Sequence, residues 1–432
     1  RSTEWNVIPY QANPDTMSNF ADMTDKDLGS REQLYKAKYL HYQQAETNTS
    51  IREGWFYRDD THQKVRSTDD VFDIYERAVG GNSTFLLNIP PNRDGKFSPA
   101  DVAVLKGTGQ RIRETYGTDL FRQAEGPKEV LDQNADTYVT VDKDGPGIVI
   151  STPQPVTLNR LVLQEAIATN GERVEKHAVD AWIDGGWKEI AHSTNIGYKR
   201  ILRFPDVTTD KIRVRILESR LTPAICTISA HHYKARPPRL SAQRNMDGLV
   251  TIEPMPQEFG WKAHGENIAE NLNAGFKIYY TTDGTEPSAG STEYKDPFQM
   301  GNNELKAVAI LNGEKGAILQ ERFGLVKKEW KVIGKTAQFL AIDLGSEHIL
   351  SGFAFTPQKQ GDKGTVAGII RISNDGKNWK EMESFEFGNL INDPSKRYHH
   401  FKQMVKARYI QVEAAEIAAR TEADALAGID IF

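Results

Sequence analysis

Cysteine is almost absent from this chain of 432 residues, in which Cys226 stands alone. A single cysteine can neither form a disulfide within the chain nor build a cysteine zinc site, and its apolar neighbours predict a buried, unreactive thiol. The compartment stays open, because large domains do not need disulfides. The ten histidines show no paired metal-ligand spacing, and the adjacent pairs His231–His232 and His399–His400 would point to opposite faces of a strand.

Strong charge of one sign and long apolar runs are also missing. The formal net charge is −5, so the sequence offers no basic surface for nucleic acid or for an anionic membrane. No stretch approaches the roughly 18 apolar residues of a membrane-spanning helix. The chain is 38% hydrophobic and 26% charged, which is ordinary for a soluble globular protein. Its length predicts roughly two to four domains.

The first part of the chain alternates between helix and strand signals. The stretch STDDVFDIYERAVGG predicts a helix that begins at Ser67 or Thr68 and ends at Gly80. The next run, STFLLNIPP, shows no alternation and predicts a strand buried on both faces, as in a parallel sheet. A second helix should begin after Ser98. This order is typical of a parallel α/β unit, and we expect residues 1–118 to be the last part of a larger barrel.

Short strands and turn signals dominate from about residue 119. Asp184–Gly185 and Asp283–Gly284 each predict a hairpin turn, and the stretch HHYKARPPRL predicts a linker. The segments AVDAWIDGGWKEIA (Ala178–Ala191) and IIRISNDGKNWKEM (Ile369–Met382) match each other. A repeat this distant indicates a duplicated domain. The modules after the barrel are therefore predicted to be β-sandwiches.

Several of these stretches resemble known families. SIREGWFYR (Ser50–Arg58), together with the run from STDDVFDIYERAVGG through LLNIPPNRDGKFSPADVAVLK, resembles the closing strands of an α-L-fucosidase of glycoside hydrolase family 29. The resemblance covers residues 1–118, and Thr3–Glu4–Trp5 matches a segment of the branch that favours α-1,3/1,4-linked fucose. The later modules resemble a discoidin-like sandwich at 119–235 (GERVEKHAVDAWIDGGWKEIA, GYKRILRFPDV), the small sandwich of chitobiase C-termini at 236–327 (IYYTTDGTEPS, LKAVAI), and a second discoidin-like module of the factor 5/8 type C kind at 328–432.

This resemblance implies a multidomain fold. A partial (β/α) barrel would be followed by three all-β sandwiches: a discoidin-like jelly roll, a small immunoglobulin-like sandwich and a second discoidin-like jelly roll. The implied activity is that of a retaining exo-α-L-fucosidase on terminal α-1,3/1,4-linked L-fucose of a fucosylated oligosaccharide or glycoconjugate. Export to the periplasm or the cell exterior is implied as well. Catalysis would need no cofactor, although a structural calcium ion (Ca2+) is common in discoidin-like modules.

The implied chemistry needs two carboxyl groups about 5–5.5 Å apart. The family's nucleophilic aspartate is not matched in this chain, and we expect it upstream of Arg1. The match implies that Glu4 is the general acid/base, with a raised pKa if apolar walls surround it. From the residues alone, a glutamate this close to a terminus is a solvated surface group.

Three further residues are candidates for substrate binding. Trp55 would cover the apolar face of fucose, or else fill space in the core. Glu46 would bind the leaving-group sugar, or else pair with Arg52. Arg58 would rim the leaving-group subsite, or else lie in a solvated loop.

The sandwiches leave alternatives open. Trp182, Trp187 and Trp379 recur at corresponding hairpin positions, which favours core packing over sugar binding. The rival to an enzyme is a non-catalytic glycan-binding protein with a vestigial barrel. A third hypothesis is an adhesion or scaffold protein that binds protein partners through its discoidin-like modules.

Overall fold

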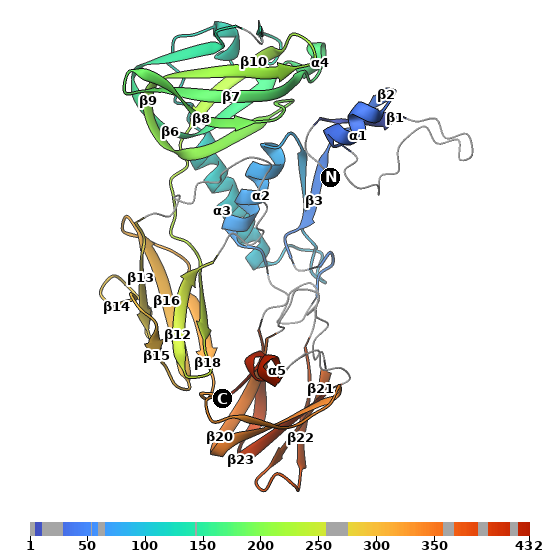
Figure 1. The fold of residues 1–432 in the computed structure, drawn as a ribbon, viewed down its shortest axis with the longest axis vertical. Coiled ribbons are helices and arrows are strands. Elements are labelled where there is room, and N and C mark those ends of the chain that lie inside the picture. Colours follow the sequence, from blue (N-terminus) through green and yellow to red (C-terminus); the bar gives the residue numbers. More distant parts are fainter. Residues whose placement is uncertain are drawn as a thin grey trace, which may run out of the picture. The chain divides into compact units, whose positions relative to one another are not determined.

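The structure of this chain is a computed structural model. It describes residues 5–10, 29–52, 54–58, 65–142, 145–255, 275–356, 367–387, 396–414 and 422–432. The described residues form two compact units, one from 5–51 and 65–235 and the other from 52–58 and 236–432 (Figure 1). Strands dominate both. In this described part of the chain, none of the helices combines the length and apolarity that a membrane span requires.

The first unit opens with strand–helix structure. Its elements are β1 (Val7–Tyr10), α1 (Arg31–Lys36), β2 (Tyr39–Tyr42), β3 (Glu46–Ser50), α2 (Thr68–Val79), β4 (Thr84–Asn88) and α3 (Pro99–Tyr116). β1 and β2 pair antiparallel, β3 and β4 pair in parallel, and α2 packs beside α3 (Figure 1). The predicted parallel strand–helix alternation is therefore present.

Both helix starts are confirmed. Ser67 caps α2, and its hydroxyl accepts a hydrogen bond from the backbone N–H of Asp70 at 3.1 Å. This satisfies one of the donors that a helix start leaves without a partner. Gly80 follows the last helical residue, as predicted. Ser98 occupies the cap position of α3 and Pro99 its first turn, where the missing proline N–H costs nothing.

One strand prediction in this region is wrong, and two other features of the strands stand out. The aromatic run after Ser50 lies outside β3, which ends at Ser50. Pro9 lies inside β1, where a two-stranded sheet tolerates a residue without an N–H donor. β4 is not buried on both faces, since Leu86 is 47% exposed. The described sheet around β4 has two strands and does not cover it.

A six-stranded antiparallel sheet follows in the same unit. Its order is β5-β10-β6-β9-β7-β8, and it encloses an apolar core that includes Leu161, Val179 and Ile228. The turn between β7 and β8 is the predicted one, because Asp184 and Gly185 both adopt positive φ, at 54° and 79°. The elements are η1 (Lys128–Val130), β5 (Val139–Thr140), β6 (Ile148–Glu165), α4 (Ile167–Asn170), β7 (Val174–Ile183), β8 (Gly186–Ser193), β9 (Arg200–Ser219) and β10 (Ala224–His231).

The second unit holds a small sandwich and a further sheet. The small sandwich comprises β11 (Leu240–Arg244), β12 (Leu249–Pro254), β13 (Lys277–Thr281), β14 (Thr292–Glu293), β15 (Phe298–Gln299), β16 (Asn303–Leu311), β17 (Glu314–Lys315) and β18 (Leu319–Phe323). Asp283–Gly284 does not join a tight hairpin, because the strand that pairs after it begins only at Thr292. The Asp283 carboxylate instead accepts hydrogen bonds from Thr285 in a local turn.

The last sheet repeats the topology of the sheet in the first unit. Its order is β19-β20-β23-β21-β22, with β24 on β20, so the long strands β20 and β23 take the places of β6 and β9. The predicted duplication agrees with this order. The elements are β19 (Lys331–Lys335), β20 (Phe339–Phe355), β21 (Ala367–Ser373), β22 (Lys380–Glu386), β23 (Arg397–Ala414), α5 (Glu422–Gly428) and β24 (Ile429–Ile431).

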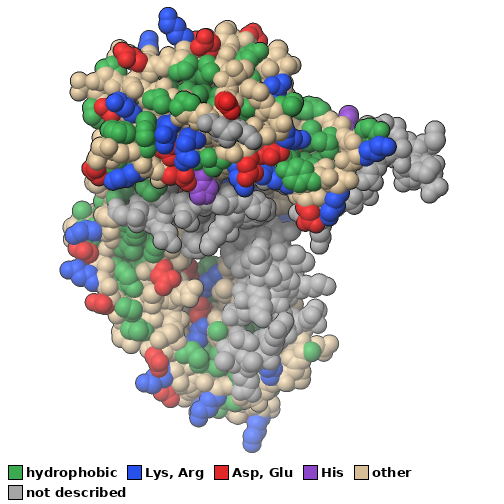
Figure 2. Space-filling model, turned by 45° about the horizontal axis from the view of Figure 1, so that its top comes forward, with side chains coloured by type: hydrophobic (Ala, Val, Ile, Leu, Met, Phe, Trp, Pro, Cys, Tyr) green, Lys and Arg blue, Asp and Glu red, His purple; other side chains and the backbone are tan. Residues whose placement is uncertain are grey.

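Two of the sandwich tryptophans lie outside the core, contrary to prediction. Trp182 and Trp187 face each other across β7 and β8 with ring centroids 5.3 Å apart, and both are half-buried. The guanidinium of Arg213 lies 4.7 Å from the Trp187 ring. This cation–π contact stabilises the Trp187 ring without core burial. Acidic and basic side chains are interspersed on the face of the molecule shown in Figure 2.

Candidate functional site

The carboxyl end of β3 is fixed by one arginine. Arg66 donates from Nε to the carbonyl of Ser50 at 2.8 Å, from Nη2 to Thr49 Oγ1 at 3.1 Å, and from Nη1 to Asp70 Oδ2 at 2.6 Å. Its backbone N–H donates to the carbonyl of Ile51 at 2.8 Å. Both ends of the intervening loop are therefore held together. The arginine–aspartate spacing of four residues was the only sequence signal for this role.

That loop carries two of the predicted substrate-binding residues. Gly54 has a φ of +78°, a backbone conformation that favours glycine, and Trp55 follows it with 45% of its surface exposed. Trp55 thus lies past the end of the strand rather than on it. Arg58 is exposed and outside regular structure. Nearby, the Arg52 guanidinium lies 5.3 Å from the Tyr57 ring.

Glu46 lies at the other end of β3. It is exposed and pairs in register with Thr84, at the amino end of the parallel pair. Four residues of extended chain separate it from Ser50, a distance of about 13 Å at 3.3 Å per residue. Barrel active sites lie at the carboxyl ends of strands. The structure therefore does not bring Glu46 to the strand end from which the Trp55 loop departs.

Glu4 lies outside the described residues, but Trp5, which follows it, is buried and hydrogen-bonded. Trp5 is 1% exposed, and its indole N–H donates to the carbonyl of Val174 in β7 at 3.2 Å. The guanidinium of Arg220 lies 3.6 Å from the ring centroid and that of Arg31 lies 5.2 Å away. The Trp5 indole therefore packs against the sandwich of the first unit. Nothing in the sequence predicted this contact.

Asn6 links three parts of the same unit. Its backbone N–H donates to Glu172 Oε2 at 2.8 Å, and its side-chain amide donates to Glu172 Oε1 at 2.9 Å. Its Oδ1 accepts from the backbone N–H of Ala45 at 2.5 Å, and its carbonyl accepts from that of Gln43 at 2.8 Å. The segment after Glu4 is therefore tied both to the start of β3 and to the sandwich.

A buried ion-pair cluster joins α2 to the sandwich. Glu76 accepts hydrogen bonds from Arg160 Nε at 2.7 Å, Arg203 Nη1 at 3.3 Å and the Tyr116 hydroxyl at 2.6 Å. Burial raises the pKa of Glu76, but the two guanidinium groups outweigh it, and the net pKa is lowered. An ionised carboxylate with this many donors is held in place and cannot serve as a proton donor. Its role is structural.

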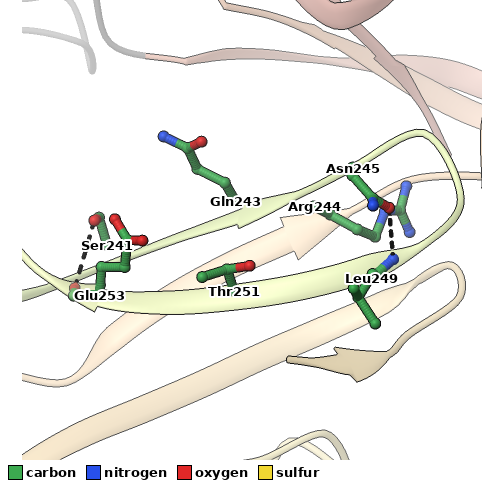
Figure 3. A pocket seen from close by; sticks show the side chains of 7 residues that line it. All are labelled: Ser241, Gln243, Arg244, Asn245, Leu249, Thr251 and Glu253. Carbon is green, nitrogen blue, oxygen red and sulfur yellow. Dashed lines mark hydrogen bonds between the residues drawn. The ribbon is translucent and has the colours of Figure 1, made fainter. Parts of the chain in front are cut away.

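A shallow polar pocket lies elsewhere, on the outer face of β11 and β12 (Figure 3). It is lined by Ser241, Gln243, Arg244, Asn245, Leu249, Thr251 and Glu253. The Arg244 guanidinium is occupied, because it donates to the carbonyls of Gly301, Gly324 and Leu325. None of the seven lining residues is aromatic, so the pocket offers hydroxyl, amide and carboxylate groups but no ring on which a sugar could stack.

Metal ligands do not converge in the described part of the chain. No group of three or more His, Cys, Asp or Glu side chains there could hold an ion, and the structural calcium ion stays a prediction because backbone carbonyls can also bind it. His231 is buried between Ser229 and the carbonyl of Thr118, whereas His232 faces Asp206. Cys226 is a buried free thiol whose pKa burial raises, as its apolar context predicted.

Comparisons with known proteins find similarity to three family models, each over part of the chain. Residues 10–116 match the family model described as alpha-L-fucosidase, residues 268–323 match one described as Fn3 associated, and residues 301–423 match the F5/8 type C domain. These matches confirm the predicted resemblance to α-L-fucosidases and to discoidin-like domains. They agree with a chain of mostly β-sheet content that carries a discoidin-like domain.

Three individual proteins are similar to this chain. A protein of Oryza sativa subsp. japonica named for alpha-L-fucosidase is 31% identical over 199 residues, which are 42% of this chain and 38% of the relative. Alpha-L-fucosidase 1 of Arabidopsis thaliana is 28% identical over 225 residues, or 47% of this chain and 44% of the relative. A crystal structure from Bacteroides ovatus ATCC 8483, described as an alpha-L-fucosidase, is 27% identical with a TM-score of 0.46, covering 100% of this chain and 60% of that one. This chain spans less than two thirds of each.

Proposed function

We propose that this chain is the C-terminal portion of a retaining exo-α-L-fucosidase that releases terminal α-1,3/1,4-linked L-fucose from glycans. The observation that carries the proposal is the match of residues 10–116 to the α-L-fucosidase family. Such glycans lie outside the cytoplasm, so the same proposal locates the protein in the periplasm or outside the cell.

The exposed apolar surface of the strand–helix region supports a larger catalytic domain. Leu86 on β4 is 47% exposed and Phe97, just before α3, is 51% exposed. In a parallel sheet these faces are normally covered by further strands and helices. We propose that residues N-terminal to this chain complete the barrel and supply the nucleophilic aspartate.

The mechanism that we propose needs two carboxyl groups and no cofactor. The aspartate attacks the anomeric carbon while Glu4 protonates the departing glycosidic oxygen, and Glu4 then removes a proton from the water that releases fucose. Trp55 presents its indole to the apolar face and C6 methyl of the sugar. Arg58 lies on the same loop and rims the leaving-group subsite. Glu46 lies at the opposite end of β3, so we assign it no direct contact with the sugar.

Glu4→Gln is expected to lower kcat/KM for a fucosylated trisaccharide about 100-fold, because general acid catalysis contributes this much or more. An aryl fucoside with a 4-nitrophenolate leaving group should lose far less, since that group departs without a proton. Both substrates are assayed on the complete protein, and NMR of the first product should show retained anomeric configuration.

The exposed Glu32, paired with Lys36 on α1, offers the matched control, and Glu32→Gln should change neither rate. Equal trisaccharide cleavage by the Glu4 variant and the unmodified protein would show that Glu4 is not the acid. Glycan binding without any cleavage would instead favour the non-catalytic glycan-binding protein.

Trp55→Ala is expected to raise the KM for fucosides about tenfold, which corresponds to about 1.4 kcal/mol of lost binding. The neighbouring Phe56 is 77% exposed and provides a matched aromatic control on the same loop. Phe56→Ala should leave KM within about twofold. Initial-rate kinetics on the aryl fucoside measure both, and identical effects of the two variants would argue against a specific sugar contact by Trp55.

A further inference from the structure

We propose that Glu172 in the sandwich of the first unit is a positioning residue for the catalytic acid, an inference that rests on the proposed function of Glu4. Glu172 lies between α4 and β7, 166 residues away in sequence from Asn6. Its carboxylate accepts three hydrogen bonds, from the backbone N–H and the side-chain amide of Asn6 and from the side-chain amide of Asn82 at 2.8 Å. The sandwich therefore grips the second residue after Glu4.

Asn6 passes this constraint to the rest of the strand–helix region. It is 2% exposed, and its backbone N–H, carbonyl, side-chain amide and side-chain oxygen all have partners. A buried amide with every group satisfied has one orientation, because any rotation leaves a donor or acceptor without a partner. The orientation of the chain at residue 6 is thus set by Glu172 on one side and by Ala45, at the start of β3, on the other.

Asn82 holds the same carboxylate from the end of α2. It has a φ of 64°, and its Oδ1 accepts a hydrogen bond from the backbone N–H of Tyr198 at 2.8 Å. Gly197 packs so closely that a Cβ there would lie 2.2 Å from Asn82 Nδ2. Only glycine permits this approach. The cradle around Glu172 is therefore built from both the helical region and the sandwich.

This arrangement matters for catalysis because a proton donor must be held within about 0.5 Å of its productive position. Glutamine at position 172 would keep the volume but offer one acceptor oxygen where three donors converge on two. In either orientation its own amide N–H groups would face at least one donor of Asn6. Glu172→Gln should therefore loosen the segment that follows Glu4 without opening a cavity.

The test measures kcat/KM of the complete Glu172→Gln protein on two substrates. We expect a loss of at least about tenfold on the fucosylated trisaccharide, which needs a proton, and less than about threefold on 4-nitrophenyl fucoside, which does not. Hydrogen exchange at the Asn6 and Gln43 amides should accelerate, a readout independent of activity. Glu218→Gln, which removes an exposed partner of Lys176 on the same sheet, should change none of these.

Each alternative result has a definite meaning. Equal losses on both substrates, in proportion to a lower melting temperature, overturn the positioning role, and so does an unchanged rate on the trisaccharide. If the unmodified protein cleaves neither substrate, the proposed function falls and the positioning role falls with it. If only the Glu4 variant loses selectively on the trisaccharide, the proposed function stands and the role of Glu172 alone is overturned.

Discussion

Glu76→Gln is expected to lower the free energy of unfolding of the first unit by about 3–5 kcal/mol. The substitution keeps the volume of the side chain and removes its charge. Arg160 is 1% exposed and donates hydrogen bonds from two nitrogens to the Glu76 carboxylate. The substitution would leave it a buried cation without this negative partner. Arg203 would keep its contact with Asp73 at 2.8 Å. Urea unfolding at pH 7 measures the loss, which should lower the melting temperature by on the order of 10 °C.

The ion pair of Glu76 and Arg160 also predicts how the stability of the first unit changes with pH. The pKa of Glu76 is lower in the folded state than its ordinary value of 4.5, so the unfolded state binds more protons as the pH falls. The contribution is fully present above pH 4.5 and is lost as the pH falls through the folded pKa. This loss should disappear in Glu76→Gln.

The matched control for Glu76 is an exposed pair. Lys188 and Asp184 lie 2.7 Å apart with side chains 54% and 81% exposed, and Asp184→Asn should change the free energy of unfolding very little. A loss in Glu76→Gln as small as that of Asp184→Asn would contradict the expectation. The double variant Glu76→Leu with Arg160→Met should lose less than the sum of its parts, because no charge is then buried alone.

Local signals in the sequence predicted local structure well. The starts of α2 and α3 followed from Ser67 and Ser98, and the β7–β8 turn followed from Asp184–Gly185. Each of these signals acts within four residues, through one hydrogen bond or one backbone conformation. Their outcome does not depend on what else the fold brings nearby. The repeated strand pattern likewise foretold two sheets of the same order.

Predictions that depended on distant partners were less successful. The unalternating run around Leu86 indicated a strand buried on both faces, but burial is decided by neighbouring elements rather than by the strand itself. Trp182 and Trp187 were expected in the core, and instead they pair across an outer face beside Arg213. Hydrophobic character alone does not say which face of a sheet a large ring occupies.

In the candidate site too, a sequence motif identified some residues, whereas contacts between distant residues could not be predicted. Trp55 was found through a motif, and the structure places it on a loop with an exposed indole. The contacts of Asn6 with Glu172 join residues 166 positions apart, and no spacing or periodicity points to such a pair. Polar contacts between modules of this kind are visible only once the modules are folded together.

His177 is expected to make the first unit sensitive to mild acid. It lies in β7 with no exposed surface, its Nδ1 lies 2.8 Å from the carbonyl of Thr194, and its Nε2 has no hydrogen-bond partner among the residues that the structure describes. Burial, together with the nearby charge of Arg200 and a smaller effect of His192, lowers the pKa of His177 from 6.5 to about 3. Protonation would place a second cation near Arg200 in a fully buried site.

The sign follows from the difference between the two states. The folded pKa lies below the unfolded one, so between pH 6.5 and 3 the unfolded chain binds one more proton at this position. The stabilisation is complete above pH 6.5 and falls by about 1.4 kcal/mol per pH unit below it, to a total of roughly 5 kcal/mol. Between pH 6.5 and 5, where few carboxylates titrate, the histidine alone should cost about 2 kcal/mol.

His177→Asn separates this effect from the rest of the acid response. Asparagine can still donate to the Thr194 carbonyl but carries no titratable ring, so the variant should be less stable at pH 7.5 through lost packing. Between pH 6.5 and 5 the unmodified protein should lose unfolding free energy as the pH falls. Over the same interval the variant should lose about 2 kcal/mol less. His192→Asn is the control, because that side chain is 59% exposed beside Glu189 and affects the pKa of His177 only weakly, so most of the pH dependence should remain. Parallel pH profiles of the unfolding free energy for His177→Asn and the unmodified protein would contradict this expectation. They would mean that His177 gains a proton without a cost to stability, which a fully buried ring cannot do unless the strand opens.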